Sequence, residues 1–266
     1  MHKPAYNSRI DNDFSILVCS CDEYSDVWPP FFAFFRKHWP ECPWPLHMMT
    51  NQKEFDFPSL SIVKVGFAPW GERFLKAIEQ VGGKYILILM EDYFLLEKPD
   101  EDFLRQAVAF MREQRASYLR LFPRPGPDRI TGTLEGIEIG EIDKHSDYRV
   151  SLQASIWDVD YLKRLTRRED STWDFEIEGT RRSNQMDDKL YSVSDRGRFP
   201  ISYYCTAVVK GLWRKEAVRL CRKNHVPVDT SGRGMEPFYL RWNIKPIIEM
   251  IEIKNDLKRR IARTFH

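Results

Sequence analysis

Two adjacent carboxylates, Glu91 and Asp92, directly follow the most apolar run of the chain, residues 85–90. An uninterrupted apolar run of this length is typical of a central parallel strand that helices cover on both faces. Two carboxylates at the end of such a strand concentrate negative charge, which suits a divalent cation such as Mn²⁺ or Mg²⁺ that also holds phosphate oxygens. The same pair is equally consistent with acidic residues that only end a strand.

A second group of carboxylates lies in the segment 173–179, Trp-Asp-Phe-Glu-Ile-Glu-Gly. Sugar transfer with inversion needs a carboxylate that removes the proton of the acceptor hydroxyl, and sugars pack their apolar faces on aromatic rings such as that of Trp173. Glu176 is the predicted base, with Asp174 and Glu178 as alternatives. A charged, solvated loop explains the same residues.

Basic side chains follow in two places. Arg181 and Arg182 come directly after these carboxylates, and a basic turn, Lys210-Gly211, opens the segment 210–215. Guanidinium groups bind phosphate through two parallel hydrogen bonds and could neutralise a leaving diphosphate. Surface solubility is the alternative explanation for either arginine, and a purely structural turn is the alternative for the basic segment.

The elements that must position these residues form the beginning of an open, doubly wound, mostly parallel α/β sheet flanked by helices. The expected strands are residues 14–20, 46–50, 61–65 and 85–90, and the expected helices are residues 28–39, 72–81 and 100–114. Ligands of such sheets bind beyond the carboxyl ends of the strands. Because Ser20, Cys21 and Asp22 lie at one such end and the acidic pair at another, we expect them to face one ligand.

The second half of the chain is less regular. We expect strands at residues 118–122 and 151–157, helices at 159–166 and 216–223, a polar loop with a short helix over 167–188, and a basic amphipathic helix over 247–263. The length indicates one catalytic domain, residues 1–240, with halves 14–115 and 116–240, followed by a C-terminal helical extension, residues 241–266.

The stretch 66–99 resembles the centre of the GT-A glycosyltransferases, in which a Gly-containing turn and an Arg- or Lys-bearing helix precede an apolar strand and an Asp-x-Asp motif. Trp70 and Arg73 occupy the turn and the helix, and Glu-Asp-Tyr stands where the family has Asp-x-Asp. The resemblance implies that Trp70 and Arg73 bind the nucleotide sugar, with Glu91 and Asp92 at its metal-bridged diphosphate. Basic side chains that hold the diphosphate without a metal are the alternative.

The resemblance also implies a division of the remaining candidates between donor and acceptor. The loop after the first strand, with Ser20, Cys21 and Asp22, would hold the base and ribose, Lys210 would close over the diphosphate, and Glu176 would lie on the acceptor side. The predicted function is sugar transfer from a nucleotide-sugar donor to a hydroxyl of a glycan or lipid-linked acceptor, in surface polysaccharide synthesis.

Two other functions remain as alternatives: a nucleotidyltransferase that acts on a sugar phosphate, and a glycan- or nucleotide-binding module without turnover. The loop after the first strand lacks the glycines and basic residues typical of the former. The motifs GxxxxGK[ST], GxGxxG and GxSxG are absent from the sequence, which excludes by motif the phosphate-loop NTPases, Rossmann dehydrogenases and α/β-hydrolases.

The composition shows no strong charge bias. The 41 basic and 39 acidic residues give a net charge of +2, which argues against nucleic acid as the main partner. No apolar run is long enough to span a bilayer, the N-terminus lacks the apolar segment of a secretory signal, and five cysteines without a CxxC pair indicate reduced thiols. We therefore expect a cytoplasmic protein, whose basic C-terminal helix either contacts the inner face of an anionic membrane or packs on its own domain.

Overall fold

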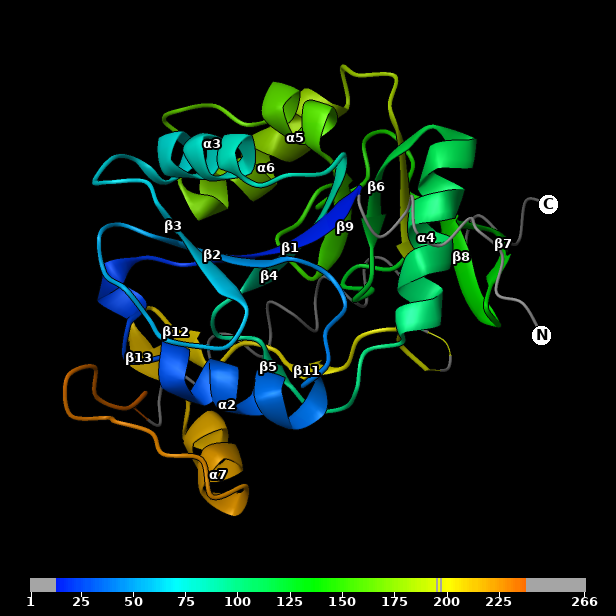
Figure 1. Ribbon diagram of the computed structural model, residues 1–266. Helices are drawn as coiled ribbons and strands as arrows, with labels where there is room; N and C mark the ends of the chain where they lie inside the picture. The colour runs from blue at the N-terminus through cyan, green and yellow to red at the C-terminus, as the bar shows by residue number, and fades with distance from the viewer. Residues whose placement is uncertain (1–12, 195, 197, 238–266) are drawn as a thin grey trace.

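The computed structural model describes residues 13–194, 196 and 198–237, and its framework is a nine-stranded sheet (Figure 1). The strands lie in the order β3-β2-β1-β4-β9-β6-β10-β8-β7. Their bounds are β1 (Phe14–Cys19), β2 (Leu46–Thr50), β3 (Leu60–Lys64), β4 (Tyr85–Met90), β6 (Ala116–Arg120), β7 (Arg129–Leu134), β8 (Ile137–Glu141), β9 (Ser155–Asp158) and β10 (Lys189–Val193). Only β9 and β8 are antiparallel to both of their neighbours, so the predicted mostly parallel α/β sheet is confirmed.

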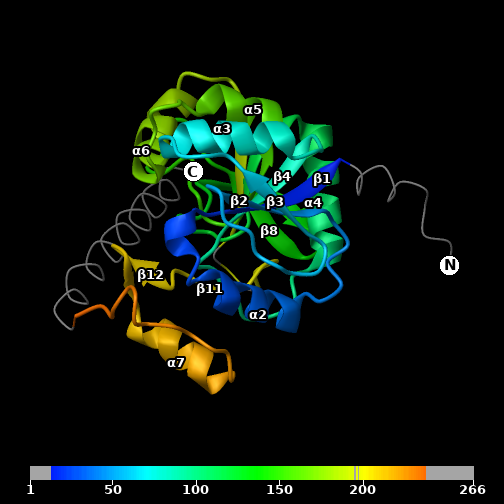
Figure 2. The same ribbon diagram turned by 60° about the vertical axis from the view of Figure 1, so that its left-hand side comes forward.

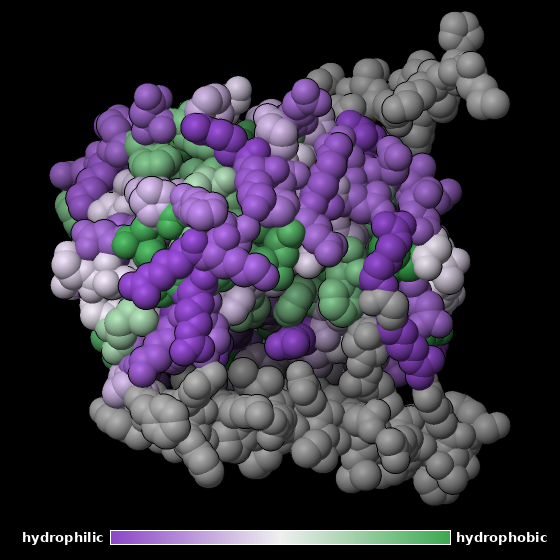
Figure 3. Space-filling model, turned by 90° about the horizontal axis from the view of Figure 1, so that it is seen from below, coloured by the Kyte–Doolittle hydropathy of each residue, from purple (hydrophilic) through white to green (hydrophobic). Residues whose placement is uncertain are grey.

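Helices cover both faces of the sheet. They are α2 (Trp28–His38), α3 (Trp70–Gln80), α4 (Glu101–Gln114), α5 (Val159–Leu165), α6 (Thr172–Ser183) and α7 (Lys215–Lys223), with a short 3-10 turn, η1 (Asp22–Tyr24), after β1. α3, α5 and α6 lie on one face, whereas α2 and α4 pack on the other, with α7 on the same side as α2 (Figures 1 and 2). Seen from the side of α2 and α7, the surface is largely hydrophilic, and hydrophobic residues are visible between the hydrophilic ones (Figure 3).

The buried side chains of β4 explain why its sequence is apolar throughout. Ile86 and Ile88 belong to the core cluster beneath α3, α5 and α6, whereas Leu87 and Leu89 belong to the cluster beneath α2 and α4. Successive side chains of a strand point to opposite faces, so a strand covered on both sides needs apolar residues at every position.

Three chain segments meet where β1 and β4 end. Cys19 pairs with Met90 in register, so the loop after β1 and the acidic pair after β4 leave the sheet next to each other. β9 runs in the opposite direction, and its first residue, Ser155, pairs with Ile88. The segment 150–154 therefore arrives at the same carboxyl edge, which is the edge where ligands of open α/β sheets bind.

Short strands from the C-terminal part pack against this edge. They are β11 (Tyr203–Tyr204), which pairs with β5 (Phe94–Leu95), and the hairpin of β12 (Val208–Val209) and β13 (Leu212–Trp213). Lys210 and Gly211 connect the hairpin with φ angles of 51° and 78°, the left-handed pair that a two-residue hairpin turn requires. The predicted basic turn is confirmed, and Trp213 is fully buried, in agreement with its structural interpretation.

The structure differs from the prediction over residues 167–188, where we expected a loop with a short helix. α6 is 12 residues long and begins at a capping box, in which Ser171 and Asp174 each accept a hydrogen bond from the other's backbone N–H. Phe175 and Gly179 face the core, and charged side chains cover the outer faces of the helix. A helix is therefore present in the predicted segment, but it is longer than expected, because the many charged residues hide the apolar pattern from which its length would be predicted. β7, β8 and β10 were not predicted.

No helix within the described part of the chain is long and apolar enough to cross a membrane. The predicted helix 247–263 and the C-terminal extension 241–266 lie outside the described residues. They, and the boundaries of the domain and its halves, stay predictions.

Candidate active site

Glu91 stands out at the carboxyl edge because one of its oxygens has no partner. The residue is 5% exposed, and its Oε2 makes no hydrogen bond to any described residue. Burial raises the pKa of Glu91 well above its ordinary value and the charge of Asp92 adds to this, whereas Arg233 and Arg73 act to lower it. A buried polar atom without a partner suggests a ligand or ion that completes the site, so Glu91 is the centre of the candidate site.

Asp92, in contrast, has its carboxylate engaged within the protein. Its Oδ2 accepts hydrogen bonds from the Thr206 hydroxyl and from the Val208 N–H (3.2 Å), and its carbonyl accepts one from the Ala207 N–H (3.0 Å). Burial raises the pKa of Asp92, and these hydrogen bonds act in the opposite direction. Asp92 therefore joins the end of β4 to the segment that packs against the carboxyl edge.

Arg73 lies beside Glu91 and the loop after β1. Its Nε donates to the carbonyl of Ala68 (3.0 Å) and its Nη1 to the carbonyl of Ser20 (3.5 Å). Its positive charge acts on Glu91 and on the thiol of Cys21, whose pKa is raised by burial and by the Glu91 charge. The structure thus brings Arg73 and Cys21 to the acidic site, as the sequence predicted.

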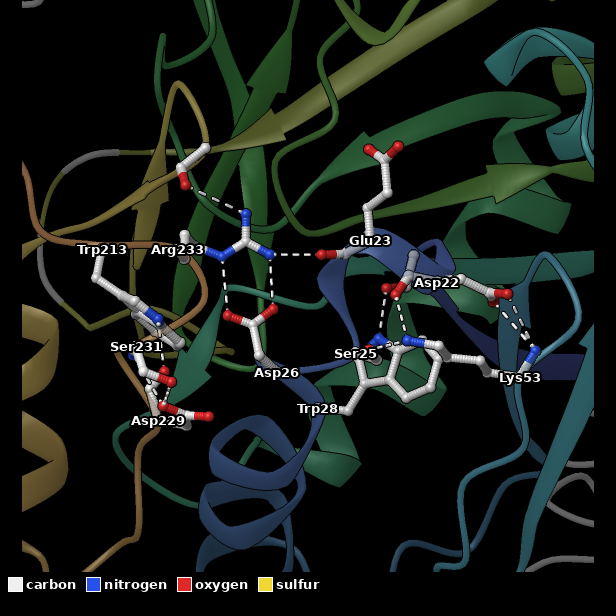
Figure 4. A network of polar contacts seen from close by, with 12 residues as sticks. Asp22, Glu23, Ser25, Asp26, Trp28, Lys53, Trp213, Asp229, Ser231 and Arg233 are labelled. Carbon is white, nitrogen blue, oxygen red and sulfur yellow. Dashed lines mark hydrogen bonds and ion pairs between the residues drawn. The ribbon is translucent and has the colours of Figure 1, made fainter.

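Two predicted donor-binding residues of the same loop have internal partners. The Ser20 hydroxyl accepts a hydrogen bond from the indole N–H of Trp28 (2.7 Å). The carboxylate of Asp22 accepts hydrogen bonds from the backbone N–H groups of residues 51–53, at 2.9 to 3.2 Å. Figure 4 shows its contact with Lys53. The bond of Ser20 holds the loop after β1 to α2, and the bonds of Asp22 hold it to the loop after β2. The part of Ser20 and Asp22 in donor binding stays a prediction.

Arg233 closes the site from the C-terminal segment and was not predicted from the sequence. Its guanidinium binds both carboxylate oxygens of Asp26 (2.6 and 2.9 Å), donates to the carbonyl of Glu23 (2.7 Å) and lies 4.3 Å from the ring centroid of Tyr24 (Figure 4). Its charge acts on Glu91. These contacts join residues more than 200 positions apart, and the one local signal was the Gly-Arg-Gly sequence around the arginine.

Glu176 points from α6 toward the same edge. Its Oε1 accepts hydrogen bonds from the Leu152 N–H (2.7 Å) and the Ser151 hydroxyl (3.0 Å). Burial raises the pKa of Glu176, whereas these hydrogen bonds and the positive charge of Arg120 act to lower it. The predicted base is therefore a half-buried carboxylate held in one orientation, and the solvated-loop interpretation does not describe it.

A group of polar side chains connects Glu176 with the acidic pair. Gln153 accepts a hydrogen bond from the Tyr203 hydroxyl (2.7 Å) and donates one to the Tyr93 hydroxyl (3.3 Å), and the two tyrosine rings stack with centroids 4.7 Å apart. Burial raises the pKa of Tyr93, and the charges of Asp92 and Glu176 both add to this rise. Tyr93 thus lies close to both acidic sites. Gln153 and Tyr203 carried no recognisable signal in the sequence.

The contacts that the structure describes for the other predicted site residues are not with the acidic pair. Trp70 packs against the core cluster beneath α3, and Asp174 belongs to the capping box of its own helix. Arg181 forms an ion pair with Glu178 on the exposed surface, and Lys210 is exposed at the hairpin turn. Their parts in binding or catalysis stay predictions.

A divalent cation at this site would depend on the bound substrate for some of its ligands. In residues 13–194, 196 and 198–237, no group of three or more His, Cys, Asp or Glu side chains is arranged to hold a metal. Mg²⁺ commonly uses one or two carboxylates and completes its coordination with substrate phosphates and water. The unpartnered Oε2 of Glu91, next to Asp92, fits such an arrangement.

Comparisons with known proteins concern the fold. No protein-family model and no curated protein matches the chain. Residues 1–349 of S. aureus TarS match with a TM-score of 0.48 at 14% identity, over 73% of this chain and 60% of that one, and TarS complexes with UDP and UDP-GlcNAc match with TM-scores of 0.47 and 0.45. UDP-glucose pyrophosphorylase with UDP-glucose matches at 0.43 and 10% identity, over 71% and 92%. At identities of 10 to 14% and TM-scores below 0.5, these likenesses assign neither a family nor an activity to this chain.

Proposed function

We propose that this chain is a glycosyltransferase that moves a sugar from a nucleotide-sugar donor to a hydroxyl of a glycan or lipid-linked acceptor. One observation carries the proposal: the buried Glu91, whose Oε2 has no partner among the described residues, and the separate carboxylate Glu176, held by residues 151–152, lie at one sheet edge. Sugar transfer needs stabilisation of a leaving diphosphate and removal of a proton from the acceptor. Two separate charged sites at one edge suit these two tasks.

In the proposed reaction the acceptor oxygen forms a bond to the anomeric carbon of the sugar, and the bond from that carbon to the phosphate oxygen of the donor breaks. Glu176 takes the proton of the acceptor hydroxyl. The diphosphate leaves with the electron pair of the broken bond, and Arg73 and Arg233 stabilise its negative charge. Attack opposite the leaving group inverts the anomeric configuration.

Glu91 and Asp92 would hold Mn²⁺ or Mg²⁺ together with the phosphates of the donor, and the cation would add positive charge where the leaving group develops negative charge. The five cysteines are unpaired thiols, which supports a place in the reducing cytoplasm. A lipid-linked acceptor would bring the enzyme to the inner face of the membrane, in surface polysaccharide synthesis.

A module that binds a nucleotide or glycan without turnover is the second candidate, and the engagement of Asp92 favours it. Its Oδ2 already accepts two hydrogen bonds from the segment 206–208, so it is a poorer metal ligand than a fully available carboxylate. The two candidates agree on a nucleotide site next to Glu91 and differ in whether the bound donor is consumed.

A thermal-shift panel tests the donor site. UDP, GDP, CMP and TDP would each be added with and without Mn²⁺ or Mg²⁺ to the wild type, to Glu91→Gln and to Asp187→Asn, a control whose side chain is fully exposed. A ligand that binds only the native state raises the melting temperature by mass action. We expect one nucleotide to raise it in the wild type and in the control, with the metal-dependent part lost in Glu91→Gln.

Absence of a shift with all four nucleotides would contradict the donor site. The matching nucleotide sugar, incubated with the wild type, then separates the two candidates. Release of free sugar or its transfer supports the enzyme, and an intact donor after prolonged incubation supports the binding module.

A further inference from the structure

Arg120, at the end of β6, is a fully buried cation without a carboxylate partner at ion-pair distance among the described residues. Its guanidinium donates to the carbonyls of Pro125, Tyr148 and Arg149, and its Nε donates to the hydroxyl of Tyr118 (2.9 Å). Burial of an uncompensated charge is costly, and buried charges are normally paired. We therefore expect an acidic group close enough to Arg120 for the two charges to interact.

A chain of hydrogen bonds leads from Arg120 to Glu176. The Tyr118 hydroxyl accepts from Arg120 Nε and donates to the Ser151 carbonyl (3.3 Å). The hydroxyl of the same serine donates to Glu176 Oε1 (3.0 Å), and the next residue, Leu152, donates its N–H to the same oxygen (2.7 Å). In a low-dielectric interior the hydrogen bonds of such a chain polarise one another. The guanidinium charge therefore acts on the carboxylate although the two groups do not touch.

The other ionisable groups near Glu176 carry no positive charge that could replace that of Arg120. Tyr118 from β6 and Tyr93 from the end of β4 face it as neutral phenols, whose pKa values burial raises. The charged groups on the surrounding elements have partners of their own: Glu72 with Lys76 and Arg168, Arg164 with Asp188, Arg182 with Asp170, Arg181 with Glu178, Asp174 with Ser171, and Arg149 with the carbonyls of Ser183 and Asp188.

We infer that Arg120 is a positioning residue for Glu176: through Tyr118 and Ser151 it keeps the carboxylate ionised and directed to the acceptor side. The inference rests on the proposed function, in which Glu176 removes the acceptor proton. A base must be ionised at neutral pH to accept a proton, and burial alone favours its neutral form. The positive charge of Arg120 opposes that effect.

The titration of Glu176 itself tests the inference without any substrate. The full chain would be labelled with ¹³C at the side-chain carboxyl carbon of glutamate, and the Glu176 signal identified by its absence in Glu176→Gln. In Arg120→Met we expect the titration midpoint to rise by about one pH unit, since the opposite charge is lost. Arg120→Lys keeps the charge and should restore most of the difference.

A hydroxyl deletion tests the relay while Arg120 stays in place. Tyr118→Phe removes the group that joins Arg120 to Ser151, and we expect it to raise the midpoint by about half a pH unit. Tyr161→Phe is the matched control. Like Tyr118, Tyr161 is buried and packs its ring against Trp157, but its hydroxyl has no hydrogen-bond partner among the described residues. The control should leave the midpoint unchanged.

An unchanged midpoint in both Arg120→Met and Tyr118→Phe overturns the inference. If Arg120→Met does not fold, an unchanged midpoint in Tyr118→Phe is sufficient to overturn the inference. Failure of the proposed function gives a different result: the midpoint moves as expected, which supports the link from Arg120 to Glu176, while Glu176→Gln transfers sugar at the wild-type rate.

Discussion

The two acidic sites at the sheet edge differ in how the chain holds them. Glu91 and Asp92 end a central strand, and the groups that surround them come in large part from the distant segment 206–233. Glu176 lies on a helix, and both of its hydrogen-bond donors come from residues 151–152, about 25 positions away. The strand-end site is thus complete only after long-range closure of the chain, whereas the helix site needs only two segments of the second half.

The strand-end site also shows that two adjacent carboxylates can differ in whether the protein satisfies their hydrogen bonds. Asp92 has its hydrogen bonds within the protein and holds the fold together, whereas Glu91 keeps an oxygen without a partner and is available to a ligand. Buried polar groups are normally hydrogen-bonded, so the unsatisfied member of a pair is the better candidate for chemistry. The pair thus has one member that is engaged within the fold and one that is proposed to bind a ligand.

Exchange of Glu176 for glutamine separates the two sites most strongly. Because the variant removes the proposed base and leaves the proposed donor site intact, we expect sugar transfer to fall by about 10²- to 10⁴-fold. The thermal shift caused by the donor nucleotide should stay as in the wild type. The exposed Glu169→Gln serves as the control, and a loss of less than tenfold in Glu176→Gln would contradict its part as the base.

Exchange of Asp92 for alanine sharpens the contrast within the acidic pair. It removes the acceptor for the Thr206 hydroxyl and leaves the buried Val208 N–H without a partner, so the free energy of unfolding should fall by about 3 kcal/mol. Glu91→Gln keeps the shape of a side chain whose Oε2 has no hydrogen bond, and it should leave stability unchanged or higher. Denaturant unfolding measures both variants, and equal losses would contradict the division of parts.

The sequence predicted those parts of the site that one element determines. β4 was recognisable because both of its faces are buried, and its end located Glu91 and Asp92. The helix before it located Arg73. α6 was predicted only as a short helix within a polar loop, although Ser171 and Asp174 three residues later are a signal for its start.

The closure of the site could not be predicted because its contacts depend on tertiary structure. Arg233 and Asp26 lie 207 positions apart, and no local periodicity encodes such a pair. Gln153 and Tyr203 meet Tyr93 only because β9 enters the edge where β4 ends. A polar residue in a loop carries no information about the loop it will face.

Exchange of Arg233 for methionine tests that closure. The variant removes the ion pair with Asp26 from a side chain that is 10% exposed, so the free energy of unfolding should fall by about 2 kcal/mol. Arg129→Met removes an ion pair with Glu141 whose arginine is 63% exposed and should change stability by less than about 0.5 kcal/mol. The nucleotide thermal shift should weaken in Arg233→Met alone. Equal effects of the two variants would show that the long-range contact does not complete the site.

Exchange of Ser171 for alanine gives the smallest effect and tests whether the helix site is as self-contained as its contacts indicate. Loss of the cap should lower the free energy of unfolding by about 1 kcal/mol, measured in urea at neutral pH. Hydrogen bonds from Ser171 lower the pKa of Asp174 below its ordinary value of 3.8. The part of the cap that comes from the bond of the Ser171 hydroxyl to this carboxylate is therefore present above that pH and is lost as acidification protonates the folded-state carboxylate. The bond from the Asp174 N–H to the Ser171 hydroxyl does not depend on pH.

Sugar transfer by Ser171→Ala should stay near the wild-type rate, because residues 151–152 hold Glu176 one turn beyond the cap. A loss of activity close to that of Glu176→Gln would break the comparison. It would mean that the first turn of α6 orients the base, and that the helix site, like the strand-end site, depends on how its supporting element is anchored.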